Sequence, residues 1–142
     1  MAETRWALDT SVAVPLLIAS HEAHPLVSRW ASGKTLCVCG HALAETYSVL
    51  TRLPGDARLS SADAVTLMDA NFVDNVTLST ATAKDVHREL ARYGIVGGAV
   101  YDGLVALAAR DHRLTLVTRD ARARSTYEAV GAHVELLVSS SF

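Results

Sequence analysis

Short apolar runs alternate with longer amphipathic segments along the chain. Each short run is hydrophobic at consecutive positions, which is typical of strands buried on both faces of a sheet. The longer segments repeat apolar residues every three or four positions, which predicts helices. The predicted strands are residues 6–9, 35–39, 76–78, 114–117 and 133–138. The predicted helices are residues 12–19, 20–32, 41–53, 61–73, 82–93, 99–109 and 121–130.

This order of elements predicts an α/β fold with a mainly parallel central sheet and helices on both faces. The 142 residues contain neither a repeat nor a linker, so we expect a single domain over residues 1–142, with a frayed tail at 139–142. No apolar run reaches the roughly 18–20 residues of a membrane span. The opening segment, MAETRWALDTS, lacks the features of a signal peptide, so we expect a cytoplasmic protein.

Four acidic residues occupy positions where a parallel sheet collects functional side chains. Sites in such sheets form outside the carboxyl ends of the strands. Asp9 and Asp120 end two predicted strands, whereas Glu45 and Asp102 lie on predicted helices beside apolar neighbours. We therefore expect the four carboxylates to converge at one sheet edge.

Each acid taken alone also has an ordinary explanation. Asp9 precedes a helix and could be its N-cap, although Thr10 and Ser11 could each fill that position. Glu45 could be solvated or paired with Arg52. The convergence of all four is much harder to explain in this way.

Clustered carboxylates need a cation, or else some of their pKa values rise. Oxygen ligands without His or Cys favour Mg²⁺ or Mn²⁺ over zinc. The chemistry suggested is attack by a metal-activated water on a phosphodiester. A phospho-accepting receiver domain is the nearest α/β rival, but it requires paired acids after the first strand and a lysine near the last. Here Lys34 and Lys84 lie elsewhere.

The net charge and the cysteines limit the other functions. A net charge of −2 argues against a large nonspecific nucleic-acid surface. Of the 13 basic residues all except Lys34 and Lys84 are arginine, the side chain suited to bidentate contacts with phosphate. Cys37 and Cys39 are expected to be buried thiols in a reducing compartment. A zinc site that includes His41 is the alternative.

Four segments in order resemble the PIN-domain ribonucleases, and most closely the toxin halves of bacterial VapBC toxin–antitoxin pairs. They are LDTS at 8–11, HALAETYSVLTR at 41–52, YDGLVALAA at 101–109 and LVTRDAR at 116–122. The resemblance implies a three-layer PIN-like fold and an acidic Mg²⁺ site, in which Mn²⁺ can substitute. It assigns that site to Asp9, Glu45, Asp102 and Asp120, with Asp9 and Asp102 as principal ligands. Ser11 and Thr118 match supporting positions, and Arg119 and Arg122 are candidates to contact substrate phosphate.

The same resemblance implies a Mg²⁺-dependent endoribonuclease that acts on single-stranded or looped RNA of the tRNA or rRNA class. It also implies a cognate antitoxin as partner, in a homodimer or a toxin–antitoxin hetero-oligomer. Apolar residues on helices 12–19, 20–32 and 41–53 predict a groove for an amphipathic antitoxin helix. The alternative function is a non-cleaving PIN-like module that binds RNA or protein. Such degenerate members are expected to lose an acid, and this chain keeps all four.

Overall fold

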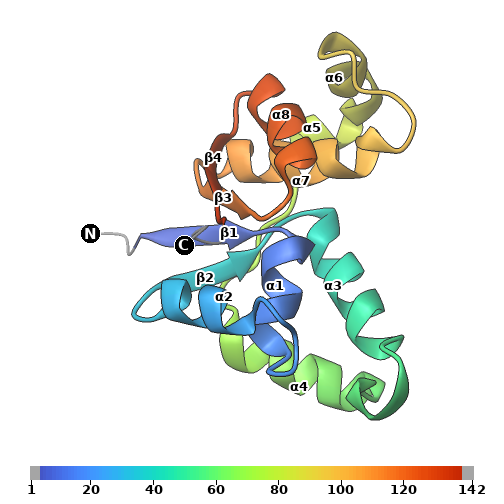
Figure 1. The fold of residues 1–142 in the computed structure, drawn as a ribbon. Coiled ribbons are helices and arrows are strands. Elements are labelled where there is room, and N and C mark those ends of the chain that lie inside the picture. The colour runs from blue at the N-terminus through green and yellow to red at the C-terminus, as the bar shows by residue number, and fades with distance from the viewer. Residues whose placement is uncertain (1–3, 139–142) are drawn as a thin grey trace.

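Four parallel strands form the centre of the computed structural model, which describes residues 4–138 (Figure 1). The strands are β1 (Arg5–Leu8), β2 (Thr35–Val38), β3 (Thr115–Thr118) and β4 (His133–Leu136), in the order β2-β1-β3-β4. In this register Leu8 pairs with Val38 on one side and with Val117 on the other. The predicted parallel sheet is therefore confirmed. The tail predicted at 139–142 lies outside the described residues.

Eight α-helices surround the sheet in this part of the chain. They are α1 (Thr10–Leu17), α2 (His24–Ala31), α3 (His41–Thr51), α4 (Ser61–Asn71), α5 (Thr80–Lys84), α6 (Val86–Arg92), α7 (Ala99–Asp111) and α8 (Ala121–Ala129). Figure 1 shows α1, α2 and α4 on one side of the sheet and α7 and α8 on the other. This arrangement confirms the predicted three-layer architecture. None of the helices within residues 4–138 is long and apolar enough to cross a membrane.

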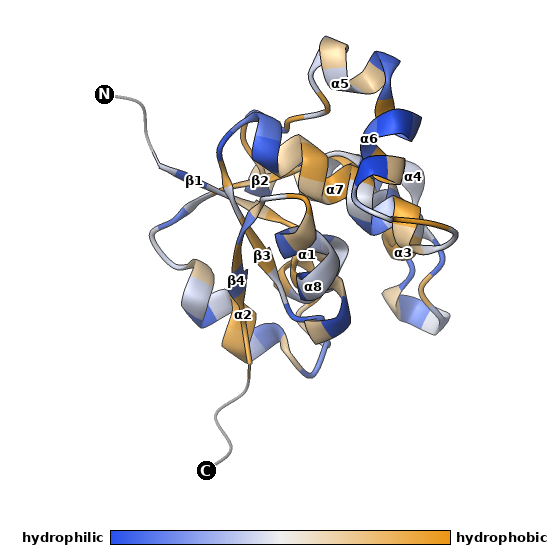
Figure 2. Cartoon of the chain, turned by 90° about the horizontal axis from the view of Figure 1, so that it is seen from above, coloured by the Kyte–Doolittle hydropathy of each residue, from blue (hydrophilic) through white to orange (hydrophobic). Residues whose placement is uncertain are grey.

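The strands and α7 supply most of the buried core. Figure 2 shows apolar residues along α7, in contrast to the polar α6. Five consecutive residues of α7 are buried, from Val105 to Ala109, so this helix is covered on nearly all sides. Cys37 and Cys39 are free and fully buried, and burial raises the pKa of the Cys39 thiol. The interpretation of both cysteines as buried thiols is therefore confirmed, and no group of three His, Cys, Asp or Glu in the described chain is arranged to hold zinc.

The predicted strand at 76–78 is wrong. Only Val76 reaches the sheet, through an isolated bridge to Cys39. The backbone N–H of Val38, at the edge of the sheet, donates instead to the side-chain Oδ1 of Asn75 at 2.8 Å. The preceding residue, Asp74, has φ of 52°, which is incompatible with an extended strand. The Asp74 backbone and the Asn75 side chain thus keep pairing from starting before Val76. Beyond Val76, residues 77 and 78 would have to pair with residues 40 and 41, where β2 has ended and α3 begins.

Two predicted helices also differ from the structure. Residues 82–93 form two helices instead of one, because the backbone at Asp85 departs from helical geometry. The segment predicted at 20–32 becomes helical only from His24, whose successor is a proline. Proline is favoured in a helix's first turn, where its missing N–H leaves no bond unmade.

A close approach between α3 and α7 depends on Gly40, the residue before α3. Its φ of +57° favours glycine, and a Cβ there would lie 2.9 Å from the Leu104 carbonyl oxygen of α7. The missing side chain lets the first turn of α3 start directly against α7. The acids carried by these two helices are thereby held near each other.

An apolar groove of about 370 Å³ lies between α3 and α4, with Leu43, Tyr47 and Val65 exposed in it. The sequence predicts helix 41–53 as one wall, and this is correct. The other two predicted walls, helices 12–19 and 20–32, do not line it, because α4 lies there instead; Val12 and Val14 of α1 and Val27 of α2 are buried in the core. We refer to this surface below as the α3–α4 groove.

Candidate active site

The carboxyl ends of β1 and β3 lie side by side at one edge of the sheet. Strand β1 ends at Leu8, which pairs with Val117 of β3. The next residue, Asp9, donates its backbone N–H to the Val117 carbonyl at 3.2 Å. The structure therefore brings Asp9 next to Thr118 and close to Asp120, at the sheet edge that the sequence predicts.

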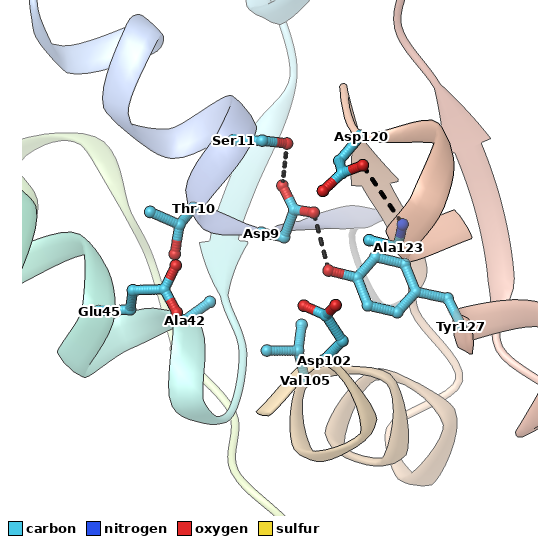
Figure 3. Close-up of a pocket in the computed structure, with 10 residues that line it drawn as sticks. All are labelled: Asp9, Thr10, Ser11, Ala42, Glu45, Asp102, Val105, Asp120, Ala123 and Tyr127. Atoms are coloured by element: carbon cyan, nitrogen blue, oxygen red, sulfur yellow. Dashed lines mark hydrogen bonds between the residues drawn. The ribbon is translucent and has the colours of Figure 1, made fainter. Parts of the chain in front are cut away.

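Asp9 is buried, with 5% of its surface exposed. The Ser11 hydroxyl donates to its Oδ1 at 2.6 Å, and the Tyr127 hydroxyl donates to its Oδ2 at 2.8 Å (Figure 3). Burial raises the pKa of Asp9 and outweighs the opposing effect of these hydrogen bonds. Although Asp9 precedes α1, its side chain makes no capping bond, so capping does not explain this acid.

Two hydroxyls join the ends of β1 and β3. Because the Ser11 hydroxyl donates to Asp9, it accepts from its other neighbours, the Arg119 backbone N–H at 2.8 Å and the Thr118 hydroxyl at 3.3 Å. Thr118 Oγ1 in turn accepts from the backbone N–H of Asp120 at 3.0 Å. Ser11 and Thr118 therefore fix the positions of two acids, in line with the supporting role that the sequence resemblance implies.

Tyr127 of α8 was not identified from the sequence. It is almost wholly buried, and its hydroxyl bonds to Asp9 across 118 positions of sequence. Burial beside Asp9 raises the pKa of Tyr127, which keeps the hydroxyl protonated as a donor. The one available signal was general: a buried tyrosine hydroxyl nearly always has a hydrogen-bond partner.

Replacing Tyr127 with phenylalanine is expected to lower the free energy of unfolding by about 1.5–3 kcal/mol at neutral pH, the range for a hydrogen bond to a charged group. The loss should be smaller in acid, because protonated Asp9 no longer carries the charge. Urea denaturation at several pH values measures both effects. Tyr47→Phe, on the exposed side of α3, is the matched control and should change stability little; an equal loss in both variants would contradict this role for Tyr127.

Asp102 lies in the first turn of α7, and Figure 3 shows its carboxylate directed toward Asp9 and Tyr127. Its pKa is raised, first by burial and then by the negative charges of Asp9, Asp120 and Glu45. The charges of all three other acids therefore affect the pKa of Asp102, as expected when four carboxylates form one cluster.

Asp120 has two roles in the structure. Its Oδ1 caps α8 by accepting from the backbone N–H groups of Arg122 at 2.9 Å and Ala123 at 3.4 Å. Its second oxygen is directed toward Asp9 in Figure 3. The cap holds the carboxylate in place and leaves one oxygen for the cavity.

Glu45 lies on α3 at the rim of the site, with 44% of its side chain exposed. It does not pair with Arg52, whose guanidinium donates to the Ser48 hydroxyl at 3.0 Å instead. The nearest basic group is His41, with Nε2 at 3.8 Å from a Glu45 carboxylate oxygen.

The two candidate arginines differ in what they contact. One Arg119 guanidinium nitrogen donates to the Ser11 carbonyl at 3.3 Å. That carbonyl lies four residues before Pro15, which has no N–H to offer it. Arg119 therefore compensates for a proline inside α1, whereas Arg122 is exposed. A contact of either side chain with substrate phosphate stays a prediction.

All four acids line a single cavity of about 80 Å³. Its lining is Asp9, Thr10, Ser11, Ala42, Glu45, Asp102, Val105, Asp120, Ala123 and Tyr127. Within residues 4–138 no lysine or arginine forms an ion pair with Asp9, Asp102 or Asp120. As the side chains lie, no three acids of the described chain are close enough to ligate one ion together. Mg²⁺ fits this arrangement, since it binds through one or two carboxylates and keeps several waters.

Comparisons with known proteins agree with this geometry. The PIN domain family model matches residues 7–129. Ribonuclease VapC27 of Mycobacterium tuberculosis is 56% identical over 128 residues, which cover 90% of this chain and 93% of the relative. Ribonuclease VapC40 of the same species is 38% identical, over 92% of this chain and 98% of the relative. The fold is also that of DNA-bound VapBC from Salmonella typhimurium, with a TM-score of 0.65 at 20% identity over 95% of this chain and 99% of that one. The chain belongs to the PIN-domain family.

Proposed function

We propose that this protein is a Mg²⁺-dependent endoribonuclease and the toxin of a type II toxin–antitoxin pair. The observation that carries the proposal is the cavity lined by four carboxylates, with no arginine or lysine of residues 4–138 ion-paired to the three of them nearest the sheet edge. Such a cluster requires a positive charge, and a hydrated divalent cation supplies it.

Asp9 and Asp102 are the principal ligands in this proposal, and Glu45 and Asp120 hold further waters or a second ion. Mn²⁺ can replace Mg²⁺ because both favour oxygen ligands. When bound, the cation activates a water and stabilises the charge that develops on the phosphodiester. The chain's own contribution is preorganisation: Ser11 and Tyr127 fix both oxygens of Asp9 before any ion arrives.

RNA is the substrate class that the relatives favour. Two relatives of 56% and 38% identity are named ribonucleases. VapC20 of M. tuberculosis, a structural neighbour with a TM-score of 0.64, is described as a Sarcin-Ricin loop cleaving toxin. We therefore propose an RNA of the tRNA or rRNA class, which would be met in the cytoplasm.

Incubation of the purified protein with total cellular RNA tests the activity. Cleavage should occur with Mg²⁺ and stop when the cation is chelated. Binding of RNA without cleavage in Mg²⁺ would favour the alternative, a non-cleaving PIN-like module. The retention of all four acids argues against that alternative.

The proposed protein partner is an antitoxin encoded beside this chain. Structural neighbours from Rickettsia felis and S. typhimurium are VapBC assemblies. The α3–α4 groove offers apolar surface for an amphipathic helix, and an antitoxin arginine could neutralise Asp9 and Asp102. A toxin homodimer within such a hetero-oligomer is part of this proposal.

Co-expression with the neighbouring open reading frame tests the partner. We expect the two proteins to co-purify and RNA cleavage to be suppressed, and we expect raised Mg²⁺ to weaken the inhibition. If no complex forms, or if the complex cleaves RNA at full rate, a stand-alone nuclease becomes the better account.

A further inference from the structure

We propose that Tyr101, stacked on His41, is a platform on which an unpaired nucleobase of the RNA packs beside the acidic cavity. The inference rests on the proposed ribonuclease function and adds to it a binding residue, which gives the expected use of unpaired RNA a physical basis. Tyr101 immediately precedes Asp102 on α7, and His41 lies one helical turn before Glu45 on α3. Both rings thus belong to the segments that carry two of the four acids.

The two rings form a pair at the surface. Their centroids are 4.8 Å apart and their planes are inclined by 31°, within the range of offset aromatic stacking. Despite this contact, 55% of the Tyr101 residue is exposed to solvent. A tyrosine that served only to join α3 to α7 would be expected to bury more of its ring.

A polar hollow begins at His41, the inner member of this pair, and runs along α3. It is lined by His41, Ala44, Glu45, Ser48 and Arg52 and has a volume of about 390 Å³. Glu45 also lines the acidic cavity, so the two depressions share a wall. Arg52 lies seven residues beyond Glu45, about 10 Å along the helix. Its guanidinium forms no ion pair with a described carboxylate, so it is available to contact a phosphate.

An exposed aromatic ring at one end of a hollow and an arginine at its other end are suited to a single strand. Bases stack on aromatic side chains with little regard to sequence, but only when they are unpaired. Binding by base stacking also suits a protein with a net charge of −2, because stacking supplies affinity for RNA that a basic surface would otherwise provide. A base held on Tyr101 would position the neighbouring phosphodiester over the carboxylates.

The test uses the Asp102→Asn protein, kept in chelator so that bound RNA is not cut, and a single-stranded oligoribonucleotide that contains 2-aminopurine. Stacking on Tyr101 should quench the 2-aminopurine fluorescence. Adding Tyr101→Leu should abolish the quench and weaken binding by about 5- to 150-fold, the range for loss of one stacked base. Adding Tyr101→Phe should preserve both, because the ring remains. Fluorescence anisotropy gives the affinity, and thermal melting checks that each variant is folded.

Tyr47→Leu is the matched control, since Tyr47 is an exposed tyrosine of α3 that lies in the α3–α4 groove. It should leave quenching and affinity as in the parent. Equal affinity of the Tyr101→Leu and parent proteins would overturn the proposal, as would an equal loss with Tyr47→Leu. An effect of Tyr101→Leu on antitoxin binding alone would assign the pair to a protein contact instead. If the wild type binds RNA through Tyr101 but does not cleave it in Mg²⁺, the proposed function fails and the platform stands.

Discussion

Replacing Asp102 with asparagine should reduce RNA cleavage by a factor of about 10²–10³, the loss typical when one electrostatic contact to the transition state is removed. The substitution is nearly isosteric, so the shape of the cavity is kept while one negative charge is deleted. Asp102 is directed into the cavity, and its pKa responds to the other three acids. Removing its charge should therefore weaken the binding of the cation that the reaction needs.

The measurement is the initial rate of RNA cleavage at fixed Mg²⁺, for the wild type and the variant. Asp69→Asn is the matched control, because Asp69 is an exposed acid of α4 outside the cavity. It deletes the same charge and should leave the rate within about twofold. A wild-type rate for Asp102→Asn would remove Asp102 from the mechanism.

The second large effect is on stability without a divalent cation. The pKa of Asp102 is raised in the folded protein, so the folded state holds its proton more tightly than the unfolded chain does. The contribution of Asp102 to the stability of the metal-free protein should therefore fall as the pH rises from below the ordinary aspartate pKa through the raised one. Asp102→Asn lacks this contribution and should melt at a higher temperature than the wild type at neutral pH in chelator.

Addition of Mg²⁺ should reverse that order. A ligand at 100 times its dissociation constant stabilises the folded state by about 2.7 kcal/mol, and Asp102→Asn should gain less. Calorimetric melting in chelator and in Mg²⁺ measures both the difference without the cation and the gain that the cation brings. The control Asp69→Asn should melt as the wild type does in both conditions. Identical melting of all three proteins in both conditions would mean that the acids do not share a site.

The sequence predicts the four strands of the sheet well, because each is a short, continuous apolar run that can be buried only in the interior of a sheet. It fails at 76–78, because the partner strand β2 ends at the bridge to Val76 and the chain turns there into α3. An apolar run does not reveal where its partner strand ends. The sequence also hides the break between α5 and α6 at Asp85, because charged residues at helical spacing continue on both sides of it.

The convergence of the four acids on one cavity is predictable, because each is tied to the end of an element or to an apolar helix face. Tyr127 and the pair of His41 with Tyr101 are not, because their contacts join segments far apart in the chain. Only one wall of the α3–α4 groove is predicted correctly, for a related reason. Which apolar residues stay exposed depends on how the helices pack, and α1 is covered where the sequence leaves it open.

Binding of Mn²⁺ is the most direct test that the four carboxylates form one cation site, because it needs no knowledge of the RNA. Free Mn²⁺ is followed by electron paramagnetic resonance as it is added to the wild type, to Asp9→Asn, Glu45→Gln, Asp102→Asn and Asp120→Asn, and to Asp69→Asn. Asparagine at 120 keeps the capping ability of the aspartate, so that variant removes charge without removing the start of α8. Weaker Mn²⁺ binding is expected in each of the four cavity variants and unchanged binding in Asp69→Asn; equal affinity in all six proteins would contradict a shared site.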